Sequence, residues 1–167
     1  MTSERVLVLR AQSGDREAFD QLLRIIEAPL HRYIAAIVPA DAEDVLQEVL
    51  ITIVRKIRWL TDPALFHAWC YRIASRAAFR ALRKKRARAE EELEDVHGEV
   101  ATYDDPWLRE RIAAETGRLP PASRAVVLLH YMEDMPLSEV AAVLDLNIGT
   151  VKSRLASALA RLRKELR

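Results

Sequence analysis

The sequence predicts an all-α protein made of two small helical domains. It has four glycines and three phenylalanines in 167 residues, too few for the turns and aromatic runs of strand folds. Ala, Leu, Arg and Glu, which are strong helix formers, are abundant instead. Half of the residues are hydrophobic and 31% are charged, so a core can form. The length excludes a large enzyme fold.

Charge is arranged in blocks, although the formal net charge is only +1. No acid occurs between Pro63 and Ala89, acidic residues then crowd positions 90–105, and the chain ends in a basic stretch. These blocks predict a helical domain over residues 1–88, an acidic linker over 89–118 and a second helical domain over 119–167. A solvated linker and a basic helix end that suits the helix dipole are the simpler interpretations of the two central blocks.

The first informative element is a helix predicted from Asp41 to about Arg58, with Asp41 placed to cap it. Its apolar stripe, at helical spacing, consists of Val45, Leu46, Val49, Leu50, Ile53 and Ile57. Asp44, Gln47 and Glu48 lie on the opposite side, with Ile51 among them. An apolar residue ringed by acids and amides is typical of a docking site with a polar rim. Single exposed aliphatic residues are also common, so a plain solvated face is the alternative.

The next element is a helix predicted from Phe66 to about Arg86. Four arginines repeat along one side at i, i+4, i+8 and i+11, and Trp69 lies in the same sector. Neighbouring cations repel one another unless an anion neutralises them, and aromatic rings can stack on exposed bases. The pattern favours a nucleic-acid-binding face. The alternative is a solvated basic stripe with Trp69 packed into the core.

The C-terminal part predicts a helix-turn-helix. A helix that begins near Leu119 is followed by a short helix from Ser138, the expected cap, to Leu144. The break Asp145-Leu-Asn leads into a helix from Gly149 to about Glu165. In a helix-turn-helix the start of the second helix enters the major groove, so its polar side chains are in reach of DNA. A helical hairpin with a polar exterior is the alternative.

No metal, cofactor or catalytic site is predicted. Cys70 is the only cysteine, and the four histidines lack the spacing of zinc ligands. We find no nucleophile, base and orienting group at suggestive spacing, so an enzyme is the least expected class. No apolar run approaches the roughly 20 residues of a membrane span. We therefore expect a cytoplasmic protein without membrane insertion.

Five segments together resemble the extracytoplasmic-function (ECF) family of bacterial RNA polymerase sigma factors, and the resemblance spans nearly the whole chain. Their order and spacing are more specific than any one of them. The segments are Arg10 to Phe19, Asp41 to Val49, Phe66 to Ala74, Leu119 to Pro121, and Gly149 to Leu155.

This resemblance implies sigma-2 and sigma-4 domains that bind core RNA polymerase, through the β′ clamp helices and the β flap, and direct it to promoter DNA. It also implies control by an anti-sigma factor and an acidic linker in the RNA-exit path. The implied polymerase contacts are Asp41, Glu43, Asp44, Gln47, Glu48 and Ile51. The implied minus-ten contacts are Thr61, Asp62, Trp69, Arg72, Arg76, Arg80, Arg83 and Lys84, with loop 61–65 holding a flipped base. The implied minus-thirty-five contacts are Thr150, Lys152, Ser153, Arg154, Ser157 and Arg161.

Three positions depart from the family pattern. Arg76 and Arg80 stand where family members often carry asparagine and aspartate, so attraction to phosphates is expected there more than contact with bases. Asp145 replaces the turn glycine of the helix-turn-helix and is expected to adopt the left-handed conformation less readily.

Two other functions remain open from the sequence. A stand-alone helix-turn-helix regulator would not need the acidic face of the Asp41 helix. A sigma mimic that only titrates an anti-sigma factor would not need the arginine stripe.

Overall fold

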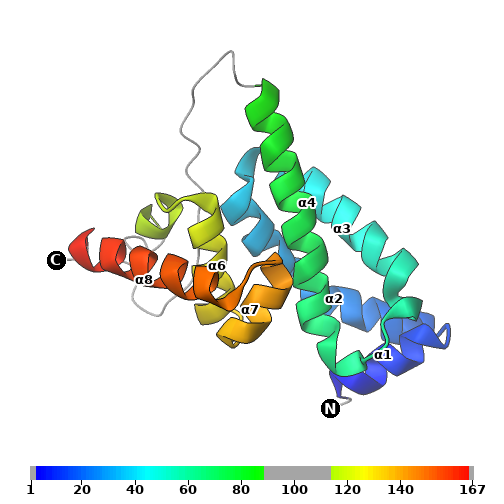
Figure 1. The fold of residues 1–167 in the computed structure, drawn as a ribbon. Coiled ribbons are helices and arrows are strands. Elements are labelled where there is room, and N and C mark those ends of the chain that lie inside the picture. Colours follow the sequence, from blue (N-terminus) through cyan, green and yellow to red (C-terminus); the bar gives the residue numbers. More distant parts are fainter. Residues whose placement is uncertain (1–2, 89–113, 166–167) are drawn as a thin grey trace.

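The computed structural model describes residues 3–88 and 114–165, and these residues form helices without any strand. The predicted all-α class is confirmed, whereas the acidic stretch at 90–105 lies outside the described residues. Figure 1 shows an N-terminal group of helices beside a C-terminal group. The N-terminal elements are α1 (Glu4–Gln12), α2 (Arg16–Ile37), η1 (Pro39–Asp41), α3 (Ala42–Lys56), η2 (Ile57–Trp59), η3 (Pro63–Leu65) and α4 (Phe66–Arg88). The C-terminal elements are α6 (Pro121–Tyr131), α7 (Leu137–Leu144) and α8 (Ile148–Glu165).

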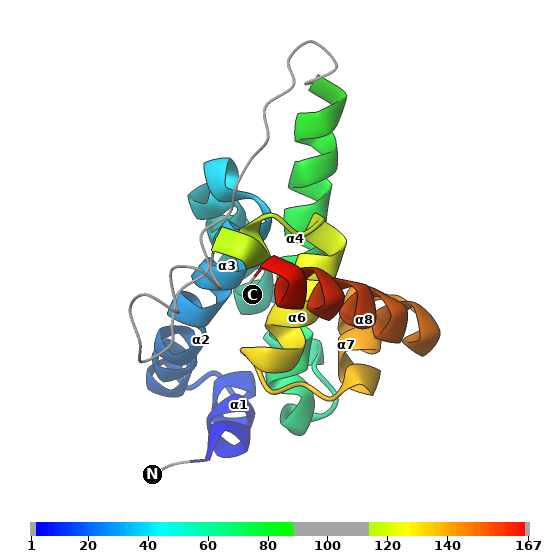
Figure 2. The ribbon, with the colours of Figure 1, turned by 90° about the vertical axis from the view of Figure 1, so that its left-hand side faces the viewer.

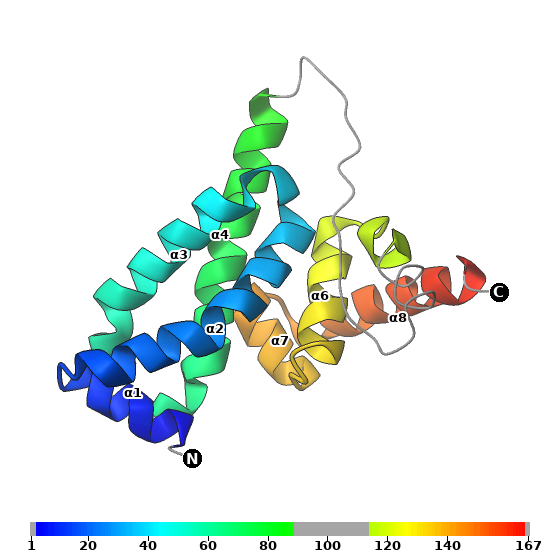
Figure 3. The ribbon, with the colours of Figure 1, turned by 180° about the vertical axis from the view of Figure 1, so that it is seen from behind.

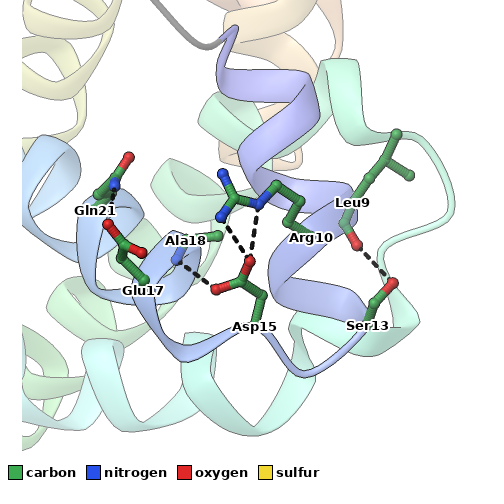
Figure 4. Close-up of polar contacts among 7 residues, drawn as sticks. All are labelled: Leu9, Arg10, Ser13, Asp15, Glu17, Ala18 and Gln21. Carbon is green, nitrogen blue, oxygen red and sulfur yellow. Dashed lines mark hydrogen bonds and ion pairs between the residues drawn. The ribbon is translucent and has the colours of Figure 1, made fainter.

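A tight turn joins α1 to α2 (Figure 4). Gly14 has a φ of +91°, which a residue without Cβ adopts at little cost. Asp15 then caps α2, because its side chain accepts a hydrogen bond from the Ala18 backbone N–H at 3.1 Å and another from Arg10 Nε at 2.8 Å. The Ala18 bond, followed by the Arg10 bond, holds the pKa of Asp15 below its ordinary value. The first segment of the resemblance therefore spans the junction of two helices.

The N-terminal core lies among α2, α3 and α4, which contact one another. The apolar stripe predicted for α3 is buried there, except that Leu50 is half-buried. Small residues of α4, including Ala74, Ala77 and Ala78, are buried and allow close helix packing. The buried Tyr33 and Ser75 hydroxyls share a hydrogen bond of 2.7 Å, which ties α2 to α4. The far end of α4 projects beyond the other helices (Figures 1 and 2).

The C-terminal core is built from α6, α7 and α8. Residues 126–129 of α6 are buried as predicted, as are Val151, Leu155 and Ala158 of α8, whereas Leu162 is half-buried. The turn at 145–147 separates α7 from α8 and gives the predicted helix-turn-helix. Asp145 adopts the left-handed conformation after all, with φ 57° and ψ 46°.

One predicted cap was right in position only, and the other was wrong. Asp41 holds the N-cap position of α3, but its side chain makes no capping hydrogen bond, because the chain enters α3 through the 3-10 turn η1 that Pro39 begins. Ser138 lies inside α7, whose N-cap position is held by Pro136 without a side-chain hydrogen bond. In both cases a proline sets the entry geometry of the helix, since its φ is already helical.

The two groups of helices contact each other, with α7 against α4 and α6 against α2. Figures 1 and 3 show α6 and α7 lying between the N-terminal helices and α8. Arg124 of α6 reaches across this contact and donates a hydrogen bond to the backbone carbonyl of Ala36 on α2. The same guanidinium donates to the carbonyls of Thr116 and Leu119, at 3.1 and 3.0 Å. Arg124 is only 3% exposed, so it belongs to the interior of the contact.

Candidate functional site

The acidic face of α3 is the first candidate surface. Glu43, Asp44, Gln47 and Glu48 are exposed, and Asp41, just before the helix, is half-buried. Ile51 is 50% exposed one turn beyond Gln47, although Val49 and Ile53 on the other side of α3 are buried. The structure therefore brings the six predicted polymerase-contact residues to one end and one side of the helix. An exposed isoleucine beside carboxylates suits a partner surface that is both basic and apolar.

The basic face of α4 is the second candidate surface. Arg72, Arg76 and Arg83 are exposed because their positions lie opposite the buried side of the helix, which carries Cys70, Ala74 and Ala77. Trp69 is half-buried and packs against Phe66, with ring centroids 6.2 Å apart. One face of Trp69 is thus anchored in the domain, and three cations stand in a row beyond it.

A groove separates α3 from α4, and it was not predicted. Arg80 Nη2 lies 2.5 Å from Glu48 Oε1 across it, so a residue assigned to DNA is paired with one assigned to polymerase. The groove has a volume of about 420 Å³. One wall is acidic (Asp41, Asp44, Glu48), the other is basic (Arg80, Lys84, Lys85, Arg88), and Ala77 and Ala81 lie between them. The periodicity of each helix predicts which residues share a face. Which residues of two helices form a pair depends on how the helices pack.

The segment between α3 and α4 presents the third set of residues. Thr61 and Asp62 are exposed, and Asp62 Oδ1 accepts a hydrogen bond from the Ala64 backbone N–H at 2.9 Å, which caps η3. Just before them Trp59 is 62% exposed, and the Arg58 guanidinium carbon lies 4.2 Å from the centre of its ring. Trp59 is not among the residues predicted from the sequence; the available signal was an aromatic residue close to the start of the predicted loop 61–65.

The start of α8 is the fourth candidate surface. Asn147 Oδ1 accepts hydrogen bonds from the Thr150 backbone N–H at 2.8 Å and from its hydroxyl at 2.9 Å, so Asn147 caps the helix. Ser153 donates from its hydroxyl to the Thr150 carbonyl at 3.0 Å. Thr150 and Arg154 are half-buried, whereas the other four predicted residues are exposed: Lys152, Ser153, Ser157 and Arg161. The hydroxyls of Thr150 and Ser153 thus donate hydrogen bonds within the helix and its cap.

Within residues 3–88 and 114–165, no three His, Cys, Asp or Glu side chains come together as a metal site. Among the helices in those ranges, none is long and apolar enough to cross a membrane.

Comparison with known proteins identifies two sigma-70 regions in this chain. Residues 18–88 match the model of sigma-70 region 2, and residues 109–162 match the model of sigma-70 region 4. The chain is 32% identical to the ECF RNA polymerase sigma factor SigM of Mycobacterium tuberculosis over 166 residues, which cover 98% of this chain and 85% of that protein.

Two solved structures share the fold. The structure of CnrH in complex with the cytosolic domain of CnrY matches with a TM-score of 0.71 and 28% identity, over 98% of this chain and 96% of that chain. The sigma factor RpoE of Bartonella quintana, solved with the anti-sigma factor NepR, matches with a TM-score of 0.70 and 23% identity, over 89% and 96% of the two chains.

The region 2 match lies within residues 1–88, the region 4 match begins at residue 109, before the predicted start of the second domain at 119, and the similarity to SigM extends over nearly the whole chain. This chain therefore belongs to the ECF sigma factors of the sigma-70 family, the promoter-specificity subunits that bind core RNA polymerase and direct transcription initiation.

Proposed function

We propose that this sigma factor docks on core polymerase through the acidic face of α3 and binds promoter DNA through α4 and α8. The observation that carries the proposal is the exposure of Asp44, Gln47, Glu48 and Ile51 on one side of a helix whose other side is buried. A partner with basic groups for the carboxylates and an apolar group for Ile51 would cover this surface.

The residue roles follow this division. The docking residues are Asp41, Glu43, Asp44, Gln47, Glu48 and Ile51, facing the β′ clamp helices. The minus-ten residues are Thr61, Asp62, Trp69, Arg72, Arg76, Arg80, Arg83 and Lys84. The minus-thirty-five residues are Thr150, Lys152, Ser153, Arg154, Ser157 and Arg161. Exposed cations at these positions support contact with phosphates, the main source of affinity for DNA.

The same proposal covers the organisation and the setting of the chain. The sigma-2 domain occupies residues 1–88, the linker 89–118 and the sigma-4 domain 119–167, with the sigma-4 domain on the β flap. The protein works in the cytoplasm and catalyses no reaction of its own, since the polymerase forms the bonds. An anti-sigma factor holds it inactive. The protein partner of the similar CnrH, the cytosolic domain of CnrY, supports this last point.

Charge reversal on α3 tests the docking proposal. We expect Asp44→Arg with Glu48→Arg to weaken binding to purified core polymerase by at least about tenfold, because truncating one partner of a charge pair at an interface commonly costs more than that. Transcription from a responsive promoter should fall in parallel. The measurement is the affinity of the labelled chain for core polymerase.

A matched control reverses two exposed acids elsewhere in the same domain, Asp20→Arg with Glu27→Arg on α2. This control should keep wild-type affinity. Undiminished binding and transcription with the α3 variant would contradict the proposal and favour a stand-alone DNA-binding regulator.

A further inference from the structure

The contact between the two domains holds an ion pair that neither proposed binding face uses. His67 Nε2, in the first turn of α4, lies 3.4 Å from Glu133 Oε2, in the turn between α6 and α7. The Glu133 side chain is 15% exposed, so water shields this pair less than it shields a surface pair. The pair joins residues of different domains and exists only while α7 lies against α4.

Tyr71 completes this cluster. Its ring lies 4.9 Å from that of His67, centroid to centroid, and its hydroxyl is buried with no hydrogen bond to another described residue. Burial, followed by the nearby Glu133 carboxylate, raises the pKa of Tyr71, so the hydroxyl keeps its proton. Burial by itself would raise the pKa of Glu133, but the neighbouring His67 holds it below its ordinary value. The negative charge of Glu133 is therefore stabilised by the proton on His67.

The surrounding charges favour a proton on His67. Besides Glu133, His67 faces Glu4 of α1 and Glu139 of α7, both acidic, while Arg32 of α2 acts on Glu133 and Tyr71. The hydrogen bond to Glu133 raises the pKa of His67 in spite of the opposing effect of burial. A histidine whose pKa is higher in the closed arrangement stabilises that arrangement fully below about pH 6.5, its ordinary pKa. This contribution is lost as the pH rises through the raised pKa.

We propose that His67 and Glu133 form a clasp that keeps the free protein closed while His67 carries its proton and loosens when that proton leaves. Arg124, bonded to the Ala36 carbonyl across the same contact, is a second, pH-independent fastening. Deprotonation removes the α4 cation that is paired with Glu133 in this partly buried contact, and it leaves Arg32 of α2 as the cation that still acts on the carboxylate.

The closed arrangement has a consequence for promoter binding, which rests on the proposed roles of α4 and α8. Helix α7 contacts both α4 and α8, and an 18-residue helix such as α8 is only about 27 Å long. The names of the two elements place their centres about 25 base pairs apart, which is about 85 Å at 3.4 Å per base pair. The 23-residue α4, about 35 Å long, the roughly 10 Å diameter of α7 and the length of α8 together span less than this distance. The closed protein therefore cannot hold both elements, and a pH-sensitive clasp makes the release of the two domains easier in alkaline conditions.

Small-angle scattering of the free full-length protein tests the clasp. We expect the radius of gyration of the wild-type chain to increase between about pH 6 and about pH 9, with a midpoint above about 6.5. His67→Gln and Glu133→Gln should each remove this change and keep the larger radius throughout. Far-UV circular dichroism confirms that each variant keeps its helices.

His31→Gln is the matched control, because His31 Nε2 forms a pair with Glu43 Oε1 at 2.8 Å inside one domain. It should keep the wild-type profile. A wild-type radius that does not change with pH, or an unchanged profile in His67→Gln, would overturn the clasp. The samples contain neither polymerase nor DNA, so this outcome is independent of the charge-reversal test on α3.

Discussion

The two basic helices of this sigma factor, α4 and α8, differ in what accompanies their cations. On α4 three arginines, Arg72, Arg76 and Arg83, stand in a row with no hydroxyl or amide among them, and the fourth is paired with Glu48. On α8 the exposed Ser153 and Ser157 lie between the exposed cations Lys152 and Arg161. A row of arginines binds the phosphates of DNA whatever its base sequence. Side chains that both donate and accept hydrogen bonds, placed near the start of a helix, can distinguish the edges of the bases.

The difference indicates a division of labour within one short chain. We propose that helix α4 supplies affinity for the DNA backbone, so its contribution should depend on salt and hardly on sequence. We propose that helix α8 supplies selectivity, so its contribution should depend on sequence. The ion pair between Arg80 and Glu48 shows that part of the basic face of α4 lies next to the acidic face of α3, which is the proposed polymerase-docking surface.

The largest expected effect comes from reversing charge on α4. Arg72→Glu with Arg76→Glu should reduce open-complex formation by roughly a hundredfold on every promoter, because two phosphate contacts become repulsive. The slope of log affinity against log salt should decrease in magnitude by about two. Open complexes are counted by permanganate reactivity of the separated strands, at several salt concentrations.

The control for that pair is Arg16→Glu with Arg24→Glu, two exposed arginines of α2, which should leave open complexes unchanged. Retained strand separation in the α4 variant would instead favour a sigma mimic whose arginine stripe is expendable.

The smallest expected effect concerns the turn that orients α8. Asp145 has φ 57°, a conformation that costs glycine less than aspartate, so Asp145→Gly should raise the free energy of unfolding of the C-terminal domain by up to about 1 kcal/mol. Asp145→Ala should lower it. Urea unfolding followed by circular dichroism measures both. A less stable glycine variant would mean that the Asp145 side chain contributes more than its backbone costs.

Much of the fold could be predicted from the sequence because helical periodicity is local. The stripe from Val45 to Ile57 and the α8 repeat of Val151, Leu155 and Ala158 gave the buried faces correctly. The caps were less predictable, since Pro39 and Pro136 compete with Asp41 and Ser138 for the start of a helix.

The sequence predicts which residues share one face of a helix, but it does not predict which faces of different helices lie next to each other. The exposure of Ile51 and of Arg72 follows from their angular positions on single helices. The pairing of Arg80 with Glu48 and of His67 with Glu133 joins residues far apart in the sequence, so no local pattern reports it. Trp59 was missed for another reason: a tryptophan at the end of an apolar stripe is usually a core residue, and here its ring is left outside.

The division between α4 and α8 is tested most directly by selecting promoters from a pool randomised in both upstream elements, with core polymerase and either the wild-type chain or Lys152→Ala with Arg154→Ala. The wild-type chain should enrich a defined sequence at the minus-thirty-five element through α8. It should also enrich one at the minus-ten element through loop 61–65, which we expect to hold the flipped base, and not through the arginine row of α4. The α8 variant should lose the enrichment at the minus-thirty-five element and keep it at the minus-ten element. Equal enrichment at the minus-thirty-five element by both proteins would contradict the assignment of sequence reading to α8.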